Sequence, residues 1–448
     1  MDRPLPARVA LVNQPLGLFR SLAMARRNVL SIIPEIAVKQ PMVSGKMGKR
    51  WHMVMDPTAI REMLLDRVDD YPKSLVTKNL LRPAIGDSLF IAEGAHWRWQ
   101  RRAVAPAFSH RNMLNLSPIM TAAAQRSADR IAAGSRAINM LDEMVTATFD
   151  VISDVTFSGG DGFDRGAVHR AIDDYIAEAG KLSLFDILGL PDWLPRPGRA
   201  MSGRALKDMK RIADGAIDAR AERGPSDTPD LLDLLLDGTD PKTKRQMNTA
   251  ELRDNLLTFI VAGHETTALT LSWALYLMGF DQAVQQKARA EAQTVLQGRA
   301  ATGADVENLP YIRQIIDETL RLYPPAGVIS RTAQRNDTLC GREVRPGDTV
   351  MVPIYALGRH QQLWDQPDVF DPDRFKDRKA IDRYAYLPFG DGPRICIGAS
   401  FAQQEAVIIL ATLLSRFRFT PVAGKSPEPV MILTLRPEGG VWLTATPA

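Results

Sequence analysis

The chain has 448 residues, of which 45% are hydrophobic and 24% charged, the composition of an ordinary soluble enzyme whose length alone would allow two or three domains. Its net charge of +4 is too small to indicate a nucleic-acid-binding protein. The two cysteines, Cys340 and Cys396, exclude a disulfide framework and fit a reducing compartment.

The N-terminal region has neither the character of a secretory signal nor that of a membrane span. Apolar residues between Leu5 and Val38 are interrupted by arginines and by Glu35. No window therefore reaches the roughly 20 apolar residues that a spanning helix needs. We expect no transmembrane anchor and a cytoplasmic location.

Short strand-like stretches near both ends of the chain enclose a long helical middle. From about 117 to 323, segments rich in Ala, Leu, Arg and Glu repeat with helical spacing, and no internal repeat or low-complexity linker divides the chain. The sequence predicts a mainly α fold with a minor β lobe, forming a single domain over 1–448 with its helical body at about 80–420. The strand-like stretches are Trp51 to Met55, Thr349 to Pro353 and Val430 to Leu435.

The most strongly helical stretch runs from Asn248 to about Phe280. Asn248 followed by Glu251 resembles a capping box, and apolar residues then recur at helical spacing. At ~1.5 Å per residue this helix would be roughly 50 Å long. Its length and apolarity predict a buried central helix.

Residues 262–267 of that helix, Ala-Gly-His-Glu-Thr-Thr, break the rules for a buried helix interior. A buried carboxylate needs a partner, and threonine hydroxyls compete for backbone carbonyls and can bend the helix. The segment also begins like the zinc-protease motif H-E-x-x-H, but Ala268 stands at the last position and excludes that motif. This local rule-breaking marks residues 262–267 as a candidate functional site, and the alternative is a solvated polar kink in the helix.

Cys396 lies in a glycine-rich run, Phe389 to Gly398, directly before a helical segment. A helix N-terminus favours an anionic sulfur, and Gly390 and Gly392 permit the positive φ that such a loop requires. This thiol is therefore placed to bind a soft metal. Cys340 has no comparable surroundings, and we expect it to be a small packing residue.

The run from Phe389 to Gly398 resembles the cysteine-ligand loop of the cytochrome P450 family, F-x-x-G-x-R-x-C-x-G, at every fixed position. The resemblance implies a mostly helical fold around haem b, which is buried between the central helix and the cysteine loop. It makes Cys396 the axial ligand of the haem iron and assigns Phe389, Arg394 and Gly398 to the haem site.

Further segments resemble family motifs in the expected order. Residues 262–267 resemble the oxygen-activating motif, which implies that Glu265 and Thr266 deliver protons to bound dioxygen. The haem propionates would be bound by Trp97, Arg101 and Arg331, in addition to Arg394. The E-x-x-R and P-x-R-F segments imply a buried structural triad of Glu318, Arg321 and Arg374.

The resemblance also proposes residues for a substrate pocket, all of them apolar or small, which fits a fatty acid, a terpenoid or a steroid equally well. A further apolar run, Leu184 to Trp193 within the segment 184–197, forms either a mobile lid or ordinary core packing. The pocket residues are Phe90, Val261, Ala262, Val328, Ile329, Leu433 and Thr434.

We expect a monomeric monooxygenase that uses O2 to hydroxylate or epoxidise a lipophilic small molecule. Its electrons would come from NAD(P)H through a separate ferredoxin or flavodoxin-type carrier and its reductase. The alternatives are a peroxygenase that uses hydrogen peroxide directly and a non-enzymatic haem-thiolate sensor. The peroxygenase branch of the family typically lacks the acid–alcohol pair, and the sequence supplies no output element for a sensor. We also predict that Arg98 and Arg102 face solvent and dock an acidic electron carrier.

Overall fold

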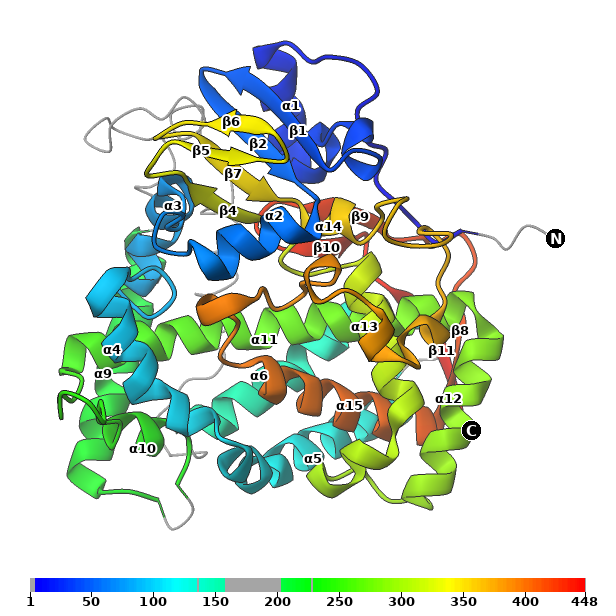
Figure 1. The fold of residues 1–448 in the computed structure, drawn as a ribbon. Coiled ribbons are helices and arrows are strands. Elements are labelled where there is room, and N and C mark those ends of the chain that lie inside the picture. Colours follow the sequence, from blue (N-terminus) through cyan, green and yellow to red (C-terminus); the bar gives the residue numbers. More distant parts are fainter. Residues whose placement is uncertain (1–4, 135–136, 158–202, 227–228, 448) are drawn as a thin grey trace. The chain divides into compact units, whose positions relative to one another are not determined.

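The computed structural model describes residues 5–134, 137–157, 203–226 and 229–447 (Figure 1). The chain forms two compact units, each assembled from separate stretches of sequence. Unit 1 comprises Met1–Pro72, Met120–Ala147 and Thr266–Ala448, and unit 2 comprises Lys73–Ile119 and Thr148–Glu265. That residues 1–448 act as a single domain stays a prediction.

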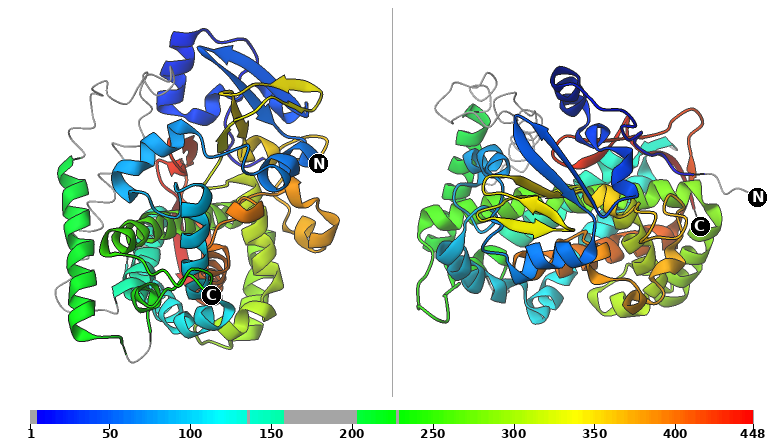
Figure 2. Two further views of the ribbon diagram at one scale, coloured as in Figure 1. Left: turned by 60° about the vertical axis from the view of Figure 1, so that its left-hand side comes forward. Right: turned by 45° about the horizontal axis from the view of Figure 1, so that its top comes forward.

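Strands from both ends of the chain meet in the small sheets of unit 1. The largest sheet has the order β1 (Met42–Met47), β2 (Lys49–Val54), β7 (Thr349–Val352), β4 (Ile329–Thr332). In it, β2 and β7 are parallel, with Trp51 opposite Thr349, while the outer pairs are antiparallel. Figures 1 and 2 show the blue N-terminal strands beside the yellow ones. A second sheet joins β3 (Ala137–Asn139), β11 (Trp442–Pro447) and β8 (Phe417–Pro421).

Two hairpins complete the strands of unit 1 in the described residues, and both correct expectations from the sequence. The stretch 430–435 is not one strand, because β9 (Glu428–Met431) and β10 (Leu435–Glu438) are antiparallel and residues 432–434 turn between them. In the other hairpin, Cys340 lies between β5 (Asp337–Leu339) and β6 (Arg342–Val344), exposed and with a φ of 50°. The expectation that it is a small packing residue is therefore wrong.

The core of unit 1 is helical and aromatic. Trp273, which is fully buried, stacks on Tyr323 with ring centroids 3.9 Å apart, and its indole donates to the carbonyl of Leu435 at 3.1 Å. Tight burial of such large rings contributes strongly to stability. The helices of unit 1 are α1 (Leu18–Arg27), α2 (Pro57–Arg61), α12 (Gln282–Leu296), α13 (Pro310–Leu322), α14 (Ile354–Leu357) and α15 (Ala399–Arg416).

Unit 2 consists of helices and loops in its described residues, and buried polar contacts connect its helices. Arg220 donates to Asp230 at 2.8 and 2.9 Å and to Asp233 at 2.6 Å, which joins two of its helices. Because all three side chains are buried, breaking any of these contacts would leave a buried charge without its counter-charge. The helices of unit 2 are α3 (Leu75–Ile85), α4 (Gly94–Val104), α9 (Gly203–Arg223) and α10 (Leu231–Leu236).

Three helices contribute residues to both units: α5 (His110–Ala133), α6 (Met140–Phe157) and α11 (Thr249–Phe280). The bounds of α11 match the predicted stretch closely, and Asn248 caps it as expected. Its side chain accepts from the amide of Glu251 at 2.9 Å, while its own amide donates to the Glu251 carboxylate at 3.1 Å.

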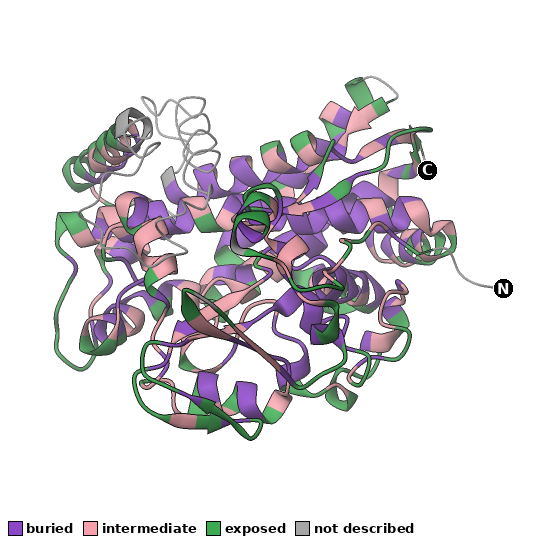
Figure 3. Cartoon of the chain, turned by 90° about the horizontal axis from the view of Figure 1, so that it is seen from above, coloured by how far each residue is buried: buried purple, intermediate pink, exposed green. Residues whose placement is uncertain are grey.

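The predicted fold class, mainly α with a minor β lobe, is confirmed. Figure 3 shows buried positions along the helices and exposed positions in the outer loops. None of the described helices is both long enough and apolar enough to cross a bilayer. The predicted apolar run at 184–193, with the rest of the segment 184–197, lies outside the described residues.

Candidate functional site

Cys396 lies in the loop between a short 3-10 turn, Gly392–Arg394, and the first residue of α15. Its amide donates to the carbonyl of Phe389 at 2.9 Å, which closes the loop, and its side chain is exposed. Gly390 and Gly392 have φ values of 68° and 69°, as the sequence predicted. A Cβ at Gly392 would lie 2.2 Å from the carbonyl oxygen of Leu64, so only glycine fits there.

A second pair of residues, which the sequence analysis missed, stabilises the start of this loop. Asp391 is buried and caps the 3-10 turn by accepting from the amide of Gly392. Its other oxygen accepts from Nε of Arg383 at 2.5 Å, and this contact raises the pKa of the guanidinium. The only sequence signal was the position of this aspartate between the two glycines of the motif.

The loop contacts the β4 edge of the main sheet of unit 1. A Cβ at Gly390 would meet Ile329 at 3.8 Å, and Ile329 is followed on β4 by Arg331, which is buried. Arg394, at the end of the 3-10 turn, is half-buried, as is Phe389. Gly398 is the N-cap residue of α15 and provides no side-chain hydrogen bond to the helix. Unit 1 thus brings the thiol, two cations and apolar side chains to one region.

In unit 2, α4 positions the two remaining residues predicted to bind propionates. Trp97 is buried and Arg101 is half-buried on this helix. The helix is attached to α11 through Gln100, whose side-chain oxygen accepts from Asn255 at 3.0 Å. Asn255 in turn accepts from the amide of Leu89, also at 3.0 Å.

Arg102, predicted to face solvent as part of a docking surface, is only partly exposed and is paired with Asp240, while the docking surface itself stays a prediction. Its Nε and one terminal nitrogen each lie 2.7 Å from an oxygen of Asp240, whose side chain is fully buried. This two-point contact lowers the pKa of Asp240 and raises that of Arg102. Arg98, by contrast, is exposed as predicted.

The middle of α11 combines a buried acid with a locally open surface. Helix α11 stays α-helical through 262–267, so the threonines do not break it. Glu265 is buried and Thr266 is half-buried. Residues 255–260 and 267–275 are buried, whereas Ala262 is exposed and its two neighbours are half-buried. Ala262 and Thr266 are one helical turn apart, so their side chains share one face of the helix.

His264 does not belong to this open face. Its side chain is buried, and Nδ1 lies 2.9 Å from the carbonyl oxygen of Ile260 one turn earlier. Its own carbonyl accepts from the hydroxyl of Thr148 on α6 at 2.9 Å. His264 is thus a core residue with local hydrogen bonds.

Glu405 is a buried acid that the sequence analysis also missed. It lies on α15, nine residues after Cys396, and is only 2% exposed. One oxygen has no hydrogen-bond partner among the described residues, while the carboxyl shares a side-chain hydrogen bond with Thr267. Burial raises the pKa of this carboxyl well above its usual value. The sequence signal was a glutamate directly before a long apolar run.

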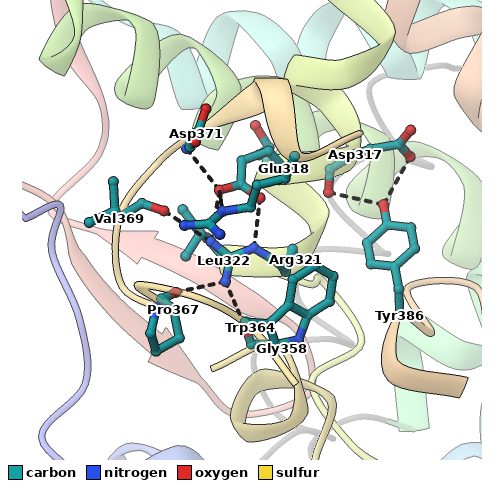
Figure 4. Close-up of polar contacts among 12 residues, drawn as sticks. Asp317, Glu318, Arg321, Leu322, Gly358, Trp364, Pro367, Val369, Asp371 and Tyr386 are labelled. Carbon is teal, nitrogen blue, oxygen red and sulfur yellow. Dashed lines mark hydrogen bonds and ion pairs between the residues drawn. The ribbon is translucent and has the colours of Figure 1, made fainter. Parts of the chain in front are cut away.

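Glu318 and Arg321 lie together in unit 1 (Figure 4), and Arg374 lies beside Glu318, as the family resemblance implied. Arg321 contacts both oxygens of Glu318, at 2.6 and 2.7 Å, and donates to the carbonyls of Pro367 and Val369 at 2.6 and 3.0 Å. Nε of Arg374 lies 3.4 Å from Glu318. This network joins α13 to the loop that leads toward the cysteine.

The proposed pocket residues of unit 1 come from two neighbouring segments. The amide of Leu435 donates to the carbonyl of Pro325 at 3.0 Å, and a Cβ at Gly327 would meet the sulfur of Met431 at 2.6 Å. The turn after Pro325 therefore lies against the β9–β10 hairpin. The pocket residues on these segments, Val328, Ile329, Leu433 and Thr434, are all half-buried.

Of the pocket residues in unit 2, Val261 and Ala262 lie on the open stretch of α11. Phe90 is 38% exposed, with the Lys73 ammonium 3.9 Å from its ring centroid. A cation over an aromatic ring is favourable at a surface.

The residues of unit 1 fit a haem group by the chemistry of their donors. An exposed thiol in a fixed loop suits a soft iron ligand, and Arg331 and Arg394 offer positive charge for propionates. The half-buried apolar side chains of Val328, Ile329 and Phe389 suit a flat apolar ring.

Comparison with known proteins agrees with this arrangement. The family model described as Cytochrome P450 matches residues 14–444, which confirms the predicted family. The chain is 33% identical to cyclooctat-9-en-7-ol 5-monooxygenase of Streptomyces melanosporofaciens, over 94% of this chain and 92% of that protein. It is 31% identical to cyclooctatin synthase of the same organism, over 93% and 91%. It is 29% identical to cytokinin hydroxylase of Arabidopsis thaliana, over 93% and 84%. The chain belongs to the cytochrome P450 family and is a P450 monooxygenase, an oxidoreductase.

Proposed function

We propose that this monooxygenase inserts one atom of O2 into a lipophilic small molecule, by hydroxylation or epoxidation, and releases the other atom as water. The observation that supports this most directly is the exposed thiol of Cys396, in a loop closed by its own backbone and shaped by two glycines with positive φ. Haem b, bound through this sulfur, supplies the activation of dioxygen when present.

The protein environment of Cys396 favours the thiolate form that iron binds. The residue precedes α15, and Gly398 at the N-cap leaves the first amides of that helix without a side-chain acceptor. Such amides and the helix dipole favour an anion nearby. The propionates of the haem would be held by Arg331, Arg394, Trp97 and Arg101.

Proton delivery is assigned to Glu265 and Thr266 on α11. The hydroxyl of Thr266 would hold a water on the open face that it shares with Ala262, and Glu265 would exchange protons with that water. The shared face of Ala262 and Thr266 supports this assignment, because it places the hydroxyl beside residues proposed to line the substrate pocket.

The substrate class is a fatty acid, terpenoid or steroid, bound against Phe90, Val261, Ala262, Val328, Ile329, Leu433 and Thr434. The apolar or small character of these residues supports a lipophile. One similar protein is named for cyclooctat-9-en-7-ol, so cyclic alcohols of that kind are the first substrates to test. Electrons would come from NAD(P)H through a ferredoxin or flavodoxin-type carrier and its reductase, with the protein a cytoplasmic monomer.

The proposal is tested first by the absorption spectrum of the reduced, CO-bound protein. Wild type and Cys340→Ser should show the Soret band typical of a thiolate ligand, whereas Cys396→Ser should lose it, because a hydroxyl is a poor soft ligand. A thiolate band that persists in Cys396→Ser would remove Cys396 as the ligand.

The second step is turnover of a panel of lipophiles with NAD(P)H and surrogate electron carriers. We expect at least one lipophile to shift the haem spin state and to be oxidised. Turnover supported by hydrogen peroxide alone would favour the peroxygenase. A normal thiolate spectrum with no oxidation of any compound would favour the sensor.

A further inference from the structure

Positive charge is concentrated at the N-terminal end of the chain. The residues from Leu5 to Met55 include eight lysines and arginines and one acidic residue, Glu35, although the chain as a whole has 56 basic and 52 acidic side chains. The remainder of the chain is therefore net acidic. Such asymmetry is typical of proteins that bind an anionic surface.

Helix α1 presents part of this charge on one face, together with an aromatic ring. Its inner positions, Ser21, Leu22 and Ala25, are buried in unit 1, and Asn28 at its C-cap donates to the carbonyl of Pro429 at 2.9 Å. The outer positions carry Phe19, Arg20, Arg26 and Arg27, all exposed. Phe19 is 81% exposed, more than any other large hydrophobic side chain among the described residues.

The turn between β1 and β2 adds Lys46 and Lys49, which are also exposed. Figures 1 and 2 show α1 and this hairpin, both in blue, as neighbours in unit 1. We name Phe19, Arg20, Arg26, Arg27, Lys46 and Lys49 the N-terminal basic surface.

Among the residues that the structure describes, no acidic side chain pairs with the cations of this surface. Other basic residues of the region are paired, Lys39 with Glu35 at 2.7 Å and Arg50 with Asp348 at 3.1 Å. The five cations of the N-terminal basic surface have no ion pair with any residue in the described part of the chain.

From these observations we infer that the N-terminal basic surface docks the protein on an anionic phospholipid bilayer. The arginines and lysines would contact lipid phosphates, and the ring of Phe19 would enter the boundary between headgroups and acyl chains. A bilayer fits better than a nucleic acid or an acidic protein, because the exposed aromatic ring stands among the charges and needs an apolar phase. Docking on a bilayer does not depend on the proposed reaction. Only the idea that the enzyme takes lipophilic substrates from the bilayer rests on the proposed function.

Docking is tested by sedimenting the haem-loaded, full-length protein with vesicles. Phosphatidylcholine alone is compared with an equimolar mixture of phosphatidylcholine and phosphatidylglycerol, at low and at physiological ionic strength. Binding should require phosphatidylglycerol and weaken with salt. The triple variant Arg20→Gln/Arg26→Gln/Arg27→Gln should bind the vesicles about a hundredfold more weakly, since each cation near an anionic surface raises the affinity by a factor of about five. Phe19→Ser should weaken binding about tenfold at both ionic strengths.

Two further variants separate docking from general effects of charge and folding. Lys46→Gln/Lys49→Gln changes the hairpin turn and leaves α1 intact, and it should weaken binding about 25-fold. The control Arg223→Gln/Lys242→Gln/Lys244→Gln removes three exposed cations from unit 2 and should retain binding within about threefold of wild type. The reduced, CO-bound spectrum of every variant should match that of wild type.

Three outcomes would overturn the inference. Equal binding to vesicles with and without phosphatidylglycerol would show that lipid charge has no part in it. Equal losses in the α1 triple variant and in the unit 2 control would show a net-charge effect. Unchanged vesicle binding combined with slower haem reduction by an acidic ferredoxin in the α1 triple variant would reassign the surface to a protein partner.

Discussion

Arg321 and Glu318 form a two-point ion pair one helical turn apart on α13, and neither side chain reaches solvent. Four more hydrogen bonds surround the pair: three backbone carbonyls accept from Arg321, and the amide of Asp371 donates to Glu318 at 2.9 Å. Arg374 adds a second cation 3.4 Å from Glu318. Removing the charge of Glu318 would leave the buried guanidinium of Arg321 without its counter-charge.

Glu318→Gln should therefore lower the free energy of unfolding by about 3–5 kcal/mol, as measured by urea denaturation. Haem content should fall in parallel, because the network holds the loop that leads toward Cys396. The control is Arg345→Gln, which breaks an ion pair with Glu343 whose side chains are both more than half exposed. Arg345→Gln should change the free energy of unfolding only slightly. Equal losses in the two variants would contradict the structural role of the triad.

Thr266→Ala should separate electron consumption from product formation. Haem binding, the substrate-induced spin shift and the first reduction need no proton at this hydroxyl, so they should be unchanged. If Thr266 holds a water as proposed, its loss should let reduced oxygen leave as hydrogen peroxide, and NAD(P)H should be consumed with little product. Glu265→Gln should instead slow oxygen consumption itself, because it interrupts the supply of protons. The measurement is the ratio of peroxide, product and NAD(P)H. Full coupling in Thr266→Ala would mean that this hydroxyl has no part in the reaction.

Arg98→Glu and Arg102→Glu should differ sharply, although the residues are one turn apart on α4. Arg102→Glu leaves the buried carboxylate of Asp240 facing a like charge, so the melting temperature should fall clearly. Arg98→Glu changes an exposed residue and should leave the melting temperature near that of wild type. Its effect should be on haem reduction by an acidic carrier, decreasing as salt rises. Equal melting temperatures for the two variants would contradict the pairing of Arg102 with Asp240.

Glu405→Gln should make the stability of the protein less dependent on pH. Burial raises the pKa of Glu405 well above 4.5, so the folded protein retains a proton that the unfolded chain releases as pH rises. As pH rises above about 4.5, the free energy of unfolding of wild type should thus fall by up to about 1.4 kcal/mol per pH unit relative to the variant. The fall should continue until the pH reaches the pKa of Glu405 in the folded protein. The variant should be more stable at pH 7 and about equal at pH 4.5. A difference that is constant between these pH values would show that Glu405 is not held neutral.

Features set by contacts close in sequence were predicted well. The glycines of the Cys396 loop, the cap and bounds of α11 and the spacing of Glu318 and Arg321 all depend on residues a few positions apart. Errors arose where short strands or surface positions were assigned from local pattern. The β9–β10 hairpin was taken for one strand, because a turn at 432–434 has no glycine or proline to mark it. Cys340 has no sequence signal for exposure, and it lies in an exposed turn instead of packing as expected.

The sequence by itself determined the family and the fold class, and it predicted the thiol ligand, because each depends on residue types at fixed short spacing. Only the tertiary structure decided which charges are paired. Arg102 and Asp240 are separated by 138 residues, and Glu405 meets Thr267 from a different helix. Pairings of this kind depend on how distant segments pack, and no local periodicity encodes them. The same holds for the parallel pairing of β2 with β7 and for the exposure of Phe19, since burial belongs to the folded chain and not to the residue.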